Sequence, residues 1–405
     1  MTDSRAVAPG KRRSDFPIVT WSLIGLNVAV YAATMFTFSS WKERYDEFYM
    51  VFGLVARDAH FFNMLTSCFL HSDVVHLLTN MLFLWLFGRT LERALGAIEY
   101  IMVYVGSGLF AAITHLAIVY AFLPQDAELP SLGASGAIAG ILGMYAIRFV
   151  RHKLHLFGME IPSALLLLAW LFLQMFLGVF SLYVPTPTLK AVDYWAHMGG
   201  FMFGMIVAHL THLSAVGRKE YLLNDAEDSY RRGTLLDVIR KYEALLRYDT
   251  NDPFTRAELG RTWALLDDEE QASKYYSTAI DLYLKTNGGT EAAARYQELL
   301  YILPNSQLPQ DLLYRLGCYL EESDKPWRAI EVLNKVCPPN GPETECQMAA
   351  LKVAQIQLNK VSRPHLAAAT LEQFLRTYPN SEWRALAEQL LRTAHTNSEK
   401  LKADG

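Results

Sequence analysis

Long runs without a charged residue dominate the first half of this chain, within residues 18–213. A helix needs about 20 mostly apolar residues to cross the hydrocarbon core of a bilayer. Inside lipid, a backbone must satisfy its own hydrogen bonds, and a helix does so. The sequence therefore predicts six spanning helices, at roughly Ile18–Phe38, Val74–Leu91, Tyr100–Leu123, Gly133–Val150, Ile161–Val184 and Tyr194–Leu213.

The second half has a different composition. Residues 218–405 are rich in Lys, Arg, Asp and Glu, and their helical periodicity carries polar faces. We expect an all-α polytopic membrane protein, with a six-transmembrane-helix bundle followed by a soluble α-helical repeat domain. The expected divisions are a cytoplasmic tail at 1–17, a membrane domain at 18–214 and a cytoplasmic repeat domain at 215–405.

Basic residues indicate the orientation, because Lys and Arg concentrate in cytoplasmic loops. They lie before the first span, between the second and third, between the fourth and fifth, and after the sixth. We therefore expect a multi-pass integral protein of a bacterial cytoplasmic (inner) membrane with both termini cytoplasmic. The basic residues at these four places are Lys11, Arg12, Arg13, Arg89, Arg93, Arg148, Arg151, Lys153, Arg218 and Lys219.

The remaining composition excludes several classes of protein. The net charge of -4 does not indicate a nucleic-acid partner. Four scattered cysteines are too few for a disulfide framework, and no zinc-type spacing occurs. We expect no cofactor and no metal.

Two polar residues stand out within the predicted spans. Ser135 lies in Gly133-Ala134-Ser135-Gly136 at the start of the fourth span, and His197 lies near the start of the sixth. Both spans enter from the outer face, so the two side chains can share one depth. A serine hydroxyl becomes a nucleophile when a base takes its proton, and histidine can serve as that base. Because Asp193 lies a full turn from His197 toward the surface, the sequence predicts a Ser-His dyad.

Donors for a developing oxyanion are expected beside this pair. His76 and Asn80 begin the second span at the same face and, four residues apart, project from one side of the helix. The backbone N–H of Ser135 lies at a helix N-terminus, where negative charge is favoured. Gly133 and Gly136 allow close backbone approach to the nucleophile.

Each of these residues also has a purely structural interpretation. A Gly-Ala-Ser-Gly run occurs in membrane helices as a packing motif, and polar side chains can join helices by hydrogen bonds. We interpret Gly200 and Gly204 as packing residues. His115 and His209 have no evident partner in the sequence, and we interpret both as structural.

Taken in order, three motifs in residues 18–213 resemble the rhomboid family of intramembrane serine proteases. The second span carries the His-x4-His-x3-Asn pattern from His71 to Asn80, with Glu92 twelve residues later. The fourth carries Gly-x-Ser-Gly, and the sixth carries Ala-His-x-Gly-Gly-x-x-x-Gly from Ala196 to Gly204. The resemblance implies Ser135 as nucleophile, His197 as base, His76 and Asn80 as oxyanion donors, and His71 and Glu92 as structural residues. It also implies that the substrates are transmembrane segments of other proteins, cut near the outer face.

The chain departs from the family pattern at two places. Phe62-Asn63 stands in the first outer loop where many members have Trp-Arg, which affects the lipid contacts of that loop. Ala139 stands four residues after the serine, where many members have an aromatic ring stacked on the histidine. The resemblance further implies that the fifth span and its outer loop, near Pro185–Pro187, move to admit substrate.

Internal repeats occur in the second half. Leu259-Gly260, followed by Ala272, Tyr276 and Ala279, recurs fifty-seven residues later as Leu316-Gly317, Ala329 and Leu333. A weaker third copy follows, and the pattern resembles the tetratricopeptide repeat. A stack of such helix pairs forms a concave surface that holds peptides. We expect it to dock a cytoplasmic protein or peptide; a structural cap or a self-association surface is the alternative. The weaker third copy of the repeat, mentioned above, comprises Ala367, Leu371, Phe374 and Pro379.

Three functions are compatible with these features. The leading hypothesis is a serine endopeptidase acting within the lipid bilayer. The alternative is a catalytically weak or inactive rhomboid-like protein that binds client transmembrane helices, for which Ala139 and the missing Trp-Arg pair are the motivation. A third is a proton or ion path through the buried histidines, which predicts ion flux that depends on His76.

Overall fold

The structure, a computed structural model, describes residues 16–38, 42–156, 158–184, 193–337 and 343–403. The chain divides into two compact units, Met1–Arg218 and Lys219–Gly405. Helix α11 (Leu213–Arg231) begins before the predicted boundary at 214 and continues beyond it. Most of the predicted 1–17 tail and the loop at Pro185–Pro187 lie outside the described residues.

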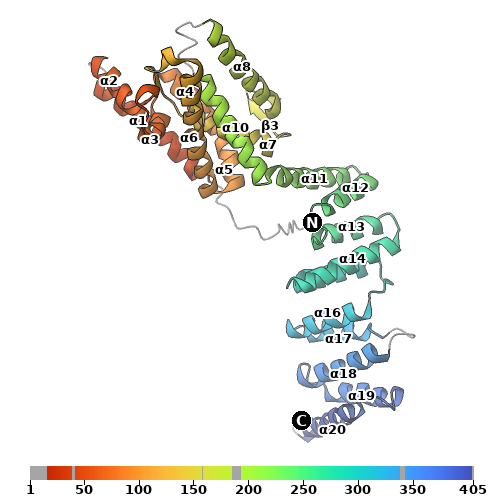
Figure 1. Ribbon diagram of the computed structural model, residues 1–405. Coiled ribbons are helices and arrows are strands. Elements are labelled where there is room, and N and C mark those ends of the chain that lie inside the picture. The colour runs from red at the N-terminus through yellow and green to blue at the C-terminus, as the bar shows by residue number, and fades with distance from the viewer. Residues whose placement is uncertain (1–15, 39–41, 157, 185–192, 338–342, 404–405) are drawn as a thin grey trace. The chain divides into compact units, whose positions relative to one another are not determined.

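The membrane unit is mainly helical, with two small antiparallel sheets (Figure 1). The β1–β2 sheet joins the segment that follows α2 to the segment that precedes Ser135. Short 3₁₀ or π segments occur at Ala56–Asp58, Ser67–Phe69, Leu84–Gly88 and Pro124–Asp126. The main elements are α1 (Ile18–Phe38), α2 (Lys42–Phe52), β1 (Leu54–Val55), α3 (Phe61–Thr66), α4 (Val74–Phe83), α5 (Arg89–Leu95), α6 (Ala97–Phe122), β2 (Pro130–Ser131), α7 (Ser135–Arg148), β3 (Lys153–Leu156), β4 (Met159–Pro162), α8 (Ser163–Tyr183) and α10 (Tyr194–Leu210).

Four helices of the described chain are long and apolar enough to cross a membrane, or up to five if α10 and α11, bent by 69°, form one span. The six-span count stays a prediction. Two predicted spans account for the difference. Helix α10, of 17 residues, counts only together with α11, and α7, an apolar helix of 14 residues, extends only about 21 Å at 1.5 Å per residue. Most of its residues are buried, so protein rather than lipid surrounds it.

Glycines bring α7 and α10 into close backbone contact. A Cβ at Gly200 would collide with the carbonyl oxygen of Gly136, and a Cβ at Gly204 would collide with that of Gly140. Small residues of this kind allow membrane helices to approach closely. The packing interpretation of Gly200 and Gly204 therefore agrees with the structure, and this contact sets the distance between Ser135 on α7 and His197 on α10.

Glu92 on α5 anchors the start of α1. Its carboxylate accepts hydrogen bonds from the backbone N–H groups of Val19 and Thr20, both at 2.8 Å, and from the Thr20 hydroxyl at 2.7 Å. The first N–H groups of a helix have no acceptor within the helix, so a buried carboxylate satisfies them. Glu92 is 5% exposed and does not belong to the Ser135 cluster.

The second unit is a succession of helices, each packed on its neighbours in the sequence (Figure 1). From α14 onward its buried apolar residues form two clusters, one around α14–α18 and one around α18–α20. The helices are α12 (Leu235–Leu246), α13 (Pro253–Ala264), α14 (Glu269–Lys285), α15 (Gly289–Ile302), α16 (Gln310–Glu322), α17 (Pro326–Asn334), α18 (Glu343–Asn359), α19 (Pro364–Thr377) and α20 (Arg384–Ala403).

The predicted repeat positions lie where paired helices cross. A Cβ at Gly260 would lie 2.8 Å from the Tyr276 ring, and a Cβ at Gly317 would lie 2.6 Å from the Leu333 side chain. In the third copy Ala367, Leu371 and Phe374 are also buried, whereas Pro379 is not. The assignment of these helix pairs to the tetratricopeptide class stays a prediction.

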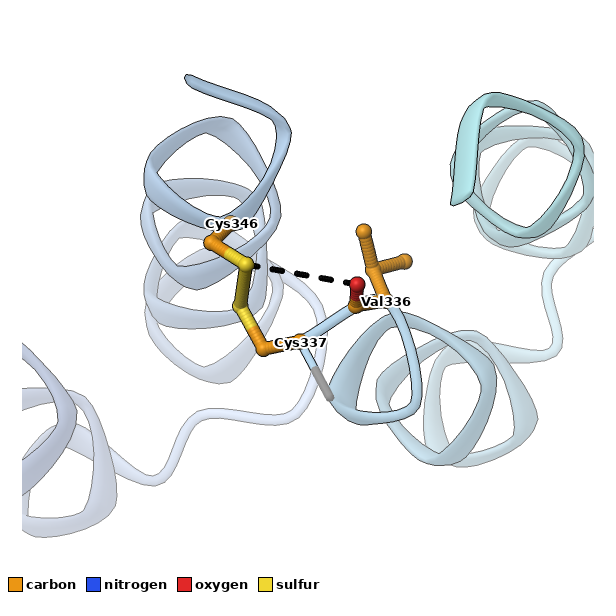
Figure 2. Close-up of a disulfide and its surroundings, with 3 residues drawn as sticks. All are labelled: Val336, Cys337 and Cys346. Atoms are coloured by element: carbon orange, nitrogen blue, oxygen red, sulfur yellow. Dashed lines mark hydrogen bonds between the residues drawn. A yellow bond between two sulfur atoms is a disulfide. The ribbon is translucent and has the colours of Figure 1, made fainter. Parts of the chain in front are cut away.

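A disulfide joins Cys337, just beyond α17, to Cys346 on α18 (Figure 2). The Cys346 sulfur also lies 4.0 Å from the carbonyl oxygen of Val336. The bridge fastens α17 to α18 across the segment 338–342, which is outside the described residues. Cys68 and Cys318 are free thiols. The scattered cysteines form no framework in the described residues, but sequence spacing did not indicate this single bridge.

Candidate active site

Ser135 is the first residue of α7, and the turn before it is held by backbone contacts. Gly133 has a φ of +124°, which a residue with a Cβ rarely adopts. Its N–H donates to the carbonyl oxygen of Ser67 at 2.9 Å, and β2 pairs with β1 just upstream. The chain therefore enters α7 with the Ser135 hydroxyl beside the first turn, where helix N–H groups lack intrahelical acceptors.

His197 lies in the first turn of α10, which Asp193 caps by accepting from the N–H of Ala196 at 3.0 Å. The imidazole is 9% exposed. Its Nε2 lies 2.7 Å from the Ser135 Oγ, although the two residues are 62 positions apart. This is hydrogen-bond distance for a hydroxyl and an imidazole nitrogen. The structure thus brings the predicted nucleophile and base into direct contact.

His76 on α4 lies beside Ser135, and Asn80 on the same helix lines the same cavity. A Cβ at Gly133 would lie 2.8 Å from the His76 Cε1 and Nε2 and 3.5 Å from the Ser135 Oγ, so the His76 ring borders the serine. The other nitrogen, Nδ1, lies 3.3 Å from the Ser72 hydroxyl. Asn80 is buried, and its Nδ2 lies 3.0 Å from the His71 Nε2. The amide nitrogen is the donor, so the His71 Nε2 accepts this hydrogen bond and holds the Asn80 side chain.

A cavity of about 710 Å³ connects these groups. Its lining includes Ser135, His197, His76, Asn80 and Gly133, and it extends to the Asp193 cluster described below. A water molecule takes up about 30 Å³ of liquid, so the polar part of this cavity has room for the water that hydrolysis consumes. Within the described residues, no group of three or more His, Cys, Asp or Glu side chains is arranged to hold a metal ion.

The comparison with protein-family models identifies the same segment. Residues 58–214 match the rhomboid domain. Ser135 and the groups around it, His197, His76, Asn80 and Gly133, all lie within that range. This chain carries a rhomboid domain. The match covers residues 58–214 of the membrane unit, and the repeat unit lies outside it.

Several known proteins are similar to this rhomboid domain. Rhomboid protein 1, mitochondrial, of Saccharomyces cerevisiae is 31% identical over 196 residues, which is 46% of this chain and 51% of the yeast protein. The putative rhomboid protease YdcA of Bacillus subtilis is 28% identical over 160 residues, 39% of this chain and 71% of that protein. The chain thus spans about half the length of the yeast relative.

Among solved structures, the MamA protein matches 40% of this chain and 92% of its own, at 15% identity and a TM-score of 0.22. A similarity at that level supports no conclusion about this chain.

The two departures from the rhomboid pattern have structural counterparts. Asn63 is buried, and its Nδ2 donates to the carbonyl oxygen of Val51 at 2.7 Å, while Phe61 and Phe62 remain exposed. The α3 segment is therefore held by a buried hydrogen bond and exposes two aromatic rings. Ala139 is fully buried. The ring near His197 comes instead from α8, where Trp170 lies 6.1 Å away between ring centroids at an angle of 35°.

Sequence reasoning missed a second contact of the histidine. The Oε1 of Gln174, also on α8, lies 2.7 Å from the His197 Nδ1. The signal available was a lone Gln within an otherwise apolar span, because a polar residue facing lipid is costly. Trp170 and Gln174 are four residues apart and therefore project from one side of α8.

Asp193 and His115 form a partly buried pair that lines the same cavity of the rhomboid domain. The Asp193 carboxylate accepts from the His115 Nδ1 at 2.6 Å and from the Ser131 hydroxyl at 2.7 Å. No partner for His115 was evident from the sequence because Asp193 is remote in the chain; its interpretation as a structural residue is compatible with this contact. These contacts join α6, β2 and the start of α10. The Asp193 carboxylate therefore contacts His115 and Ser131.

Proposed function

We propose that this protein is an intramembrane serine endopeptidase that uses Ser135 and His197 as a dyad. The observation that carries the proposal is the 2.7 Å separation between the Ser135 Oγ and the His197 Nε2 inside the rhomboid domain. A serine and an imidazole at this distance are ready for proton transfer without a rearrangement. The bordering cavity supports the proposal because hydrolysis needs water.

The chemistry proceeds by acyl transfer. His197 takes the hydroxyl proton as the Ser135 Oγ attacks the scissile carbonyl carbon, and the carbonyl oxygen becomes an oxyanion. His76, the Asn80 amide and the Ser135 N–H are the proposed donors to that oxyanion. The imidazolium then gives its proton to the leaving amine, which departs and leaves an acyl-enzyme. Water, deprotonated by His197, attacks the acyl carbon. The bond from that carbon to the Ser135 Oγ then breaks, the imidazolium returns its proton to the Oγ, and the products are a carboxylic acid and free Ser135.

The proposed substrates are transmembrane segments of other membrane proteins, cut near the outer face. The test is cleavage of such a substrate by purified full-length protein in liposomes. Ser135→Ala and His197→Ala are each expected to lower kcat by a factor on the order of 10⁴ or more, as in other serine hydrolases whose nucleophile or base is removed.

Ser181→Ala is the matched control. Ser181 lines the same cavity, but its hydroxyl donates to the carbonyl oxygen of Gly178 on its own helix at 2.8 Å. Its activity is expected to equal that of the unaltered protein. Cleavage by Ser135→Ala at the unaltered rate contradicts the proposal. Tight substrate binding without cleavage by any variant indicates instead a protein that holds client helices.

We also propose that both termini are cytoplasmic and that the repeat unit docks a cytoplasmic protein segment, in the first instance the tail of a substrate. The distribution of Lys and Arg supports the orientation. A C-terminal tag is expected to resist protease in intact spheroplasts and to be digested after lysis; digestion in intact spheroplasts contradicts the orientation.

For docking, the full-length protein is compared on substrates with and without a cytoplasmic tail. Docking predicts a higher KM for the tailless substrate, and equal KM values contradict it.

A further inference from the structure

Gln174 is a buried polar residue in the middle of α8, a mainly apolar helix. This helix is the least buried of the four long apolar helices, with 17% of its apolar window buried. Its buried residues are Ser163, Leu167, Gln174 and Gly178. An amide within an apolar span is costly unless it forms hydrogen bonds. The hydrogen bond that the Gln174 Oε1 makes is to the His197 ring.

The identity of the contacting atom determines the form of the imidazole. A carbonyl oxygen only accepts, so the His197 Nδ1 must carry the proton in this contact. A neutral imidazole has one N–H, which leaves the Nε2 with a lone pair. That lone pair faces the Ser135 Oγ at 2.7 Å. Gln174 therefore selects the tautomer that can accept the serine proton.

Trp170 restrains the same ring from another direction. Its indole packs near the imidazole and also lies 5.9 Å from the Phe201 ring on α10. Gln174 fixes the orientation of the imidazole through its Nδ1, and Trp170 limits its tilt. Ala139 has no ring with which to perform this task from α7.

We propose that Gln174, assisted by Trp170, is a positioning residue that holds His197 as the Nδ1–H tautomer aimed at Ser135. The inference rests on the proposed peptidase function. When His197 takes the serine proton, its Nδ1–H stays bonded to the Gln174 carbonyl, whose negative end stabilises the imidazolium. Gln174 itself gains and loses no proton, so it acts through His197 alone.

The test measures kcat and KM across pH for three α8 variants of the full-length protein in liposomes. Gln174→Met keeps the length of the side chain but removes the strong acceptor. We expect it to lower kcat about 10- to 100-fold, part of the 10²- to 10⁴-fold that general acid–base catalysis supplies, with little change in KM. Gln174→Glu keeps an acceptor and is expected to restore kcat to within about threefold. Met175→Leu is the control, since Met175 is 48% exposed and lies outside the site.

Two further measurements keep the outcomes separate. The thermal midpoint of each variant in detergent reports folding. If Gln174→Met lowers that midpoint, Trp170→Leu provides the second measurement, with an expected kcat loss of about 3- to 10-fold at constant KM. The inference is overturned if Gln174→Met cleaves as fast as the unaltered protein, or if Gln174→Glu is as slow as Gln174→Met. These two outcomes bear on Gln174 only if Ser135→Ala does not cleave the substrate. If Ser135→Ala does cleave it, the proposed peptidase function is overturned instead.

Discussion

In both units glycines allow helices to pack closely, but the kind of atom that contacts the glycine differs between the units. In the membrane unit, Gly200 and Gly204 lie against backbone carbonyl groups of α7. In the repeat unit, Gly260 and Gly317 lie against the side chains of Tyr276 and Leu333. Helices in lipid gain little from burying apolar area against each other, so close backbone packing and polar contacts hold them. In water, burial of apolar side chains supplies the stabilisation.

This difference determines how each unit responds to change. A side chain can rotate away from an added methyl group, whereas a helix backbone in a packed bundle moves only with its whole helix. The membrane unit also buries polar groups such as His71, Asn80 and Glu92, each with a specific partner. We therefore expect larger losses from substitutions in the membrane unit, and the following predictions test that ranking from the largest effect to the smallest.

Gly204→Leu is expected to have the largest effect. The new Cβ meets the Gly140 carbonyl group, and overpacking of this kind costs about 3 kcal/mol or more when a backbone must move. The measurement is the thermal midpoint of the purified protein in detergent. Gly25→Leu on α1 is the control, because no atom lies within 4 Å of a Cβ at Gly25. Equal midpoints for the two variants would contradict the role assigned to the α7–α10 contact.

Glu92→Ala is expected to destabilise the membrane unit by about 2–3 kcal/mol. It leaves the N–H groups of Val19 and Thr20 and the Thr20 hydroxyl without their acceptor in a buried site. Glu92→Gln keeps one acceptor oxygen and should lose less. Hydrogen exchange at the start of α1 measures the loss locally. Unchanged exchange in Glu92→Ala would show that the carboxylate does not hold α1.

Gly260→Ala and Gly317→Ala compare the two repeats with each other. At Gly260 the neighbours are a rigid Tyr276 ring and a backbone oxygen, so we expect a cost of about 1–3 kcal/mol. At Gly317 the Leu333 side chain can rotate, and alanine favours the helix, so the net cost should stay below about 1 kcal/mol. Hydrogen exchange of α13–α14 and α16–α17 peptides provides both values. A larger loss at Gly317 would contradict the distinction between rigid and mobile neighbours.

Asp281→Asn in the repeat unit is expected to have the smallest effect. Burial raises the pKa of the Asp281 carboxyl, but hydrogen bonds and ion pairs with Lys285 and Arg315 outweigh it and hold the pKa below its usual value. The contribution to stability is therefore present above the ordinary Asp pKa and is lost as pH falls through the lowered value. Because the pair is partly exposed, the cost at pH 7 should be at most about 1 kcal/mol.

The pH dependence checks this assignment. Pulse proteolysis of the repeat unit should show a difference between the unaltered protein and Asp281→Asn at pH 7 that disappears once the carboxyl is protonated. A difference that grows on acidification contradicts the assignment.

Features that depend on sequence period or on neighbouring residues could be predicted. Apolar runs predicted the long helices of the membrane unit, and the shared depth of Ser135 and His197 followed from where their helices begin. The spacing of Gly260 and Gly317 from Ala272 and Ala329 predicted close helix crossings. For Ser135 and His197 the information was the position of each residue within its own helix, and for the repeats it was the spacing of residues on consecutive helices.

Contacts between remote segments could not be predicted in this way. Gln174 meets His197 only because α8 packs on α10, and His115 meets Asp193 across 78 positions of chain for the same kind of reason. The short length of α7 also depends on tertiary structure, because its neighbours, rather than lipid, surround it. The bridge between Cys337 and Cys346 depends on how α17 meets α18.

The most direct test of the central claim is covalent labelling by a fluorophosphonate probe, which reacts with a serine that a base has activated. The full-length protein, Ser135→Ala and His197→Ala are treated at pH 7 in detergent, and the modified peptide is located by mass spectrometry. The account predicts a label on Ser135 in the unaltered protein, and none at that position in either variant. No label on Ser135, or equal labelling without His197, would contradict it.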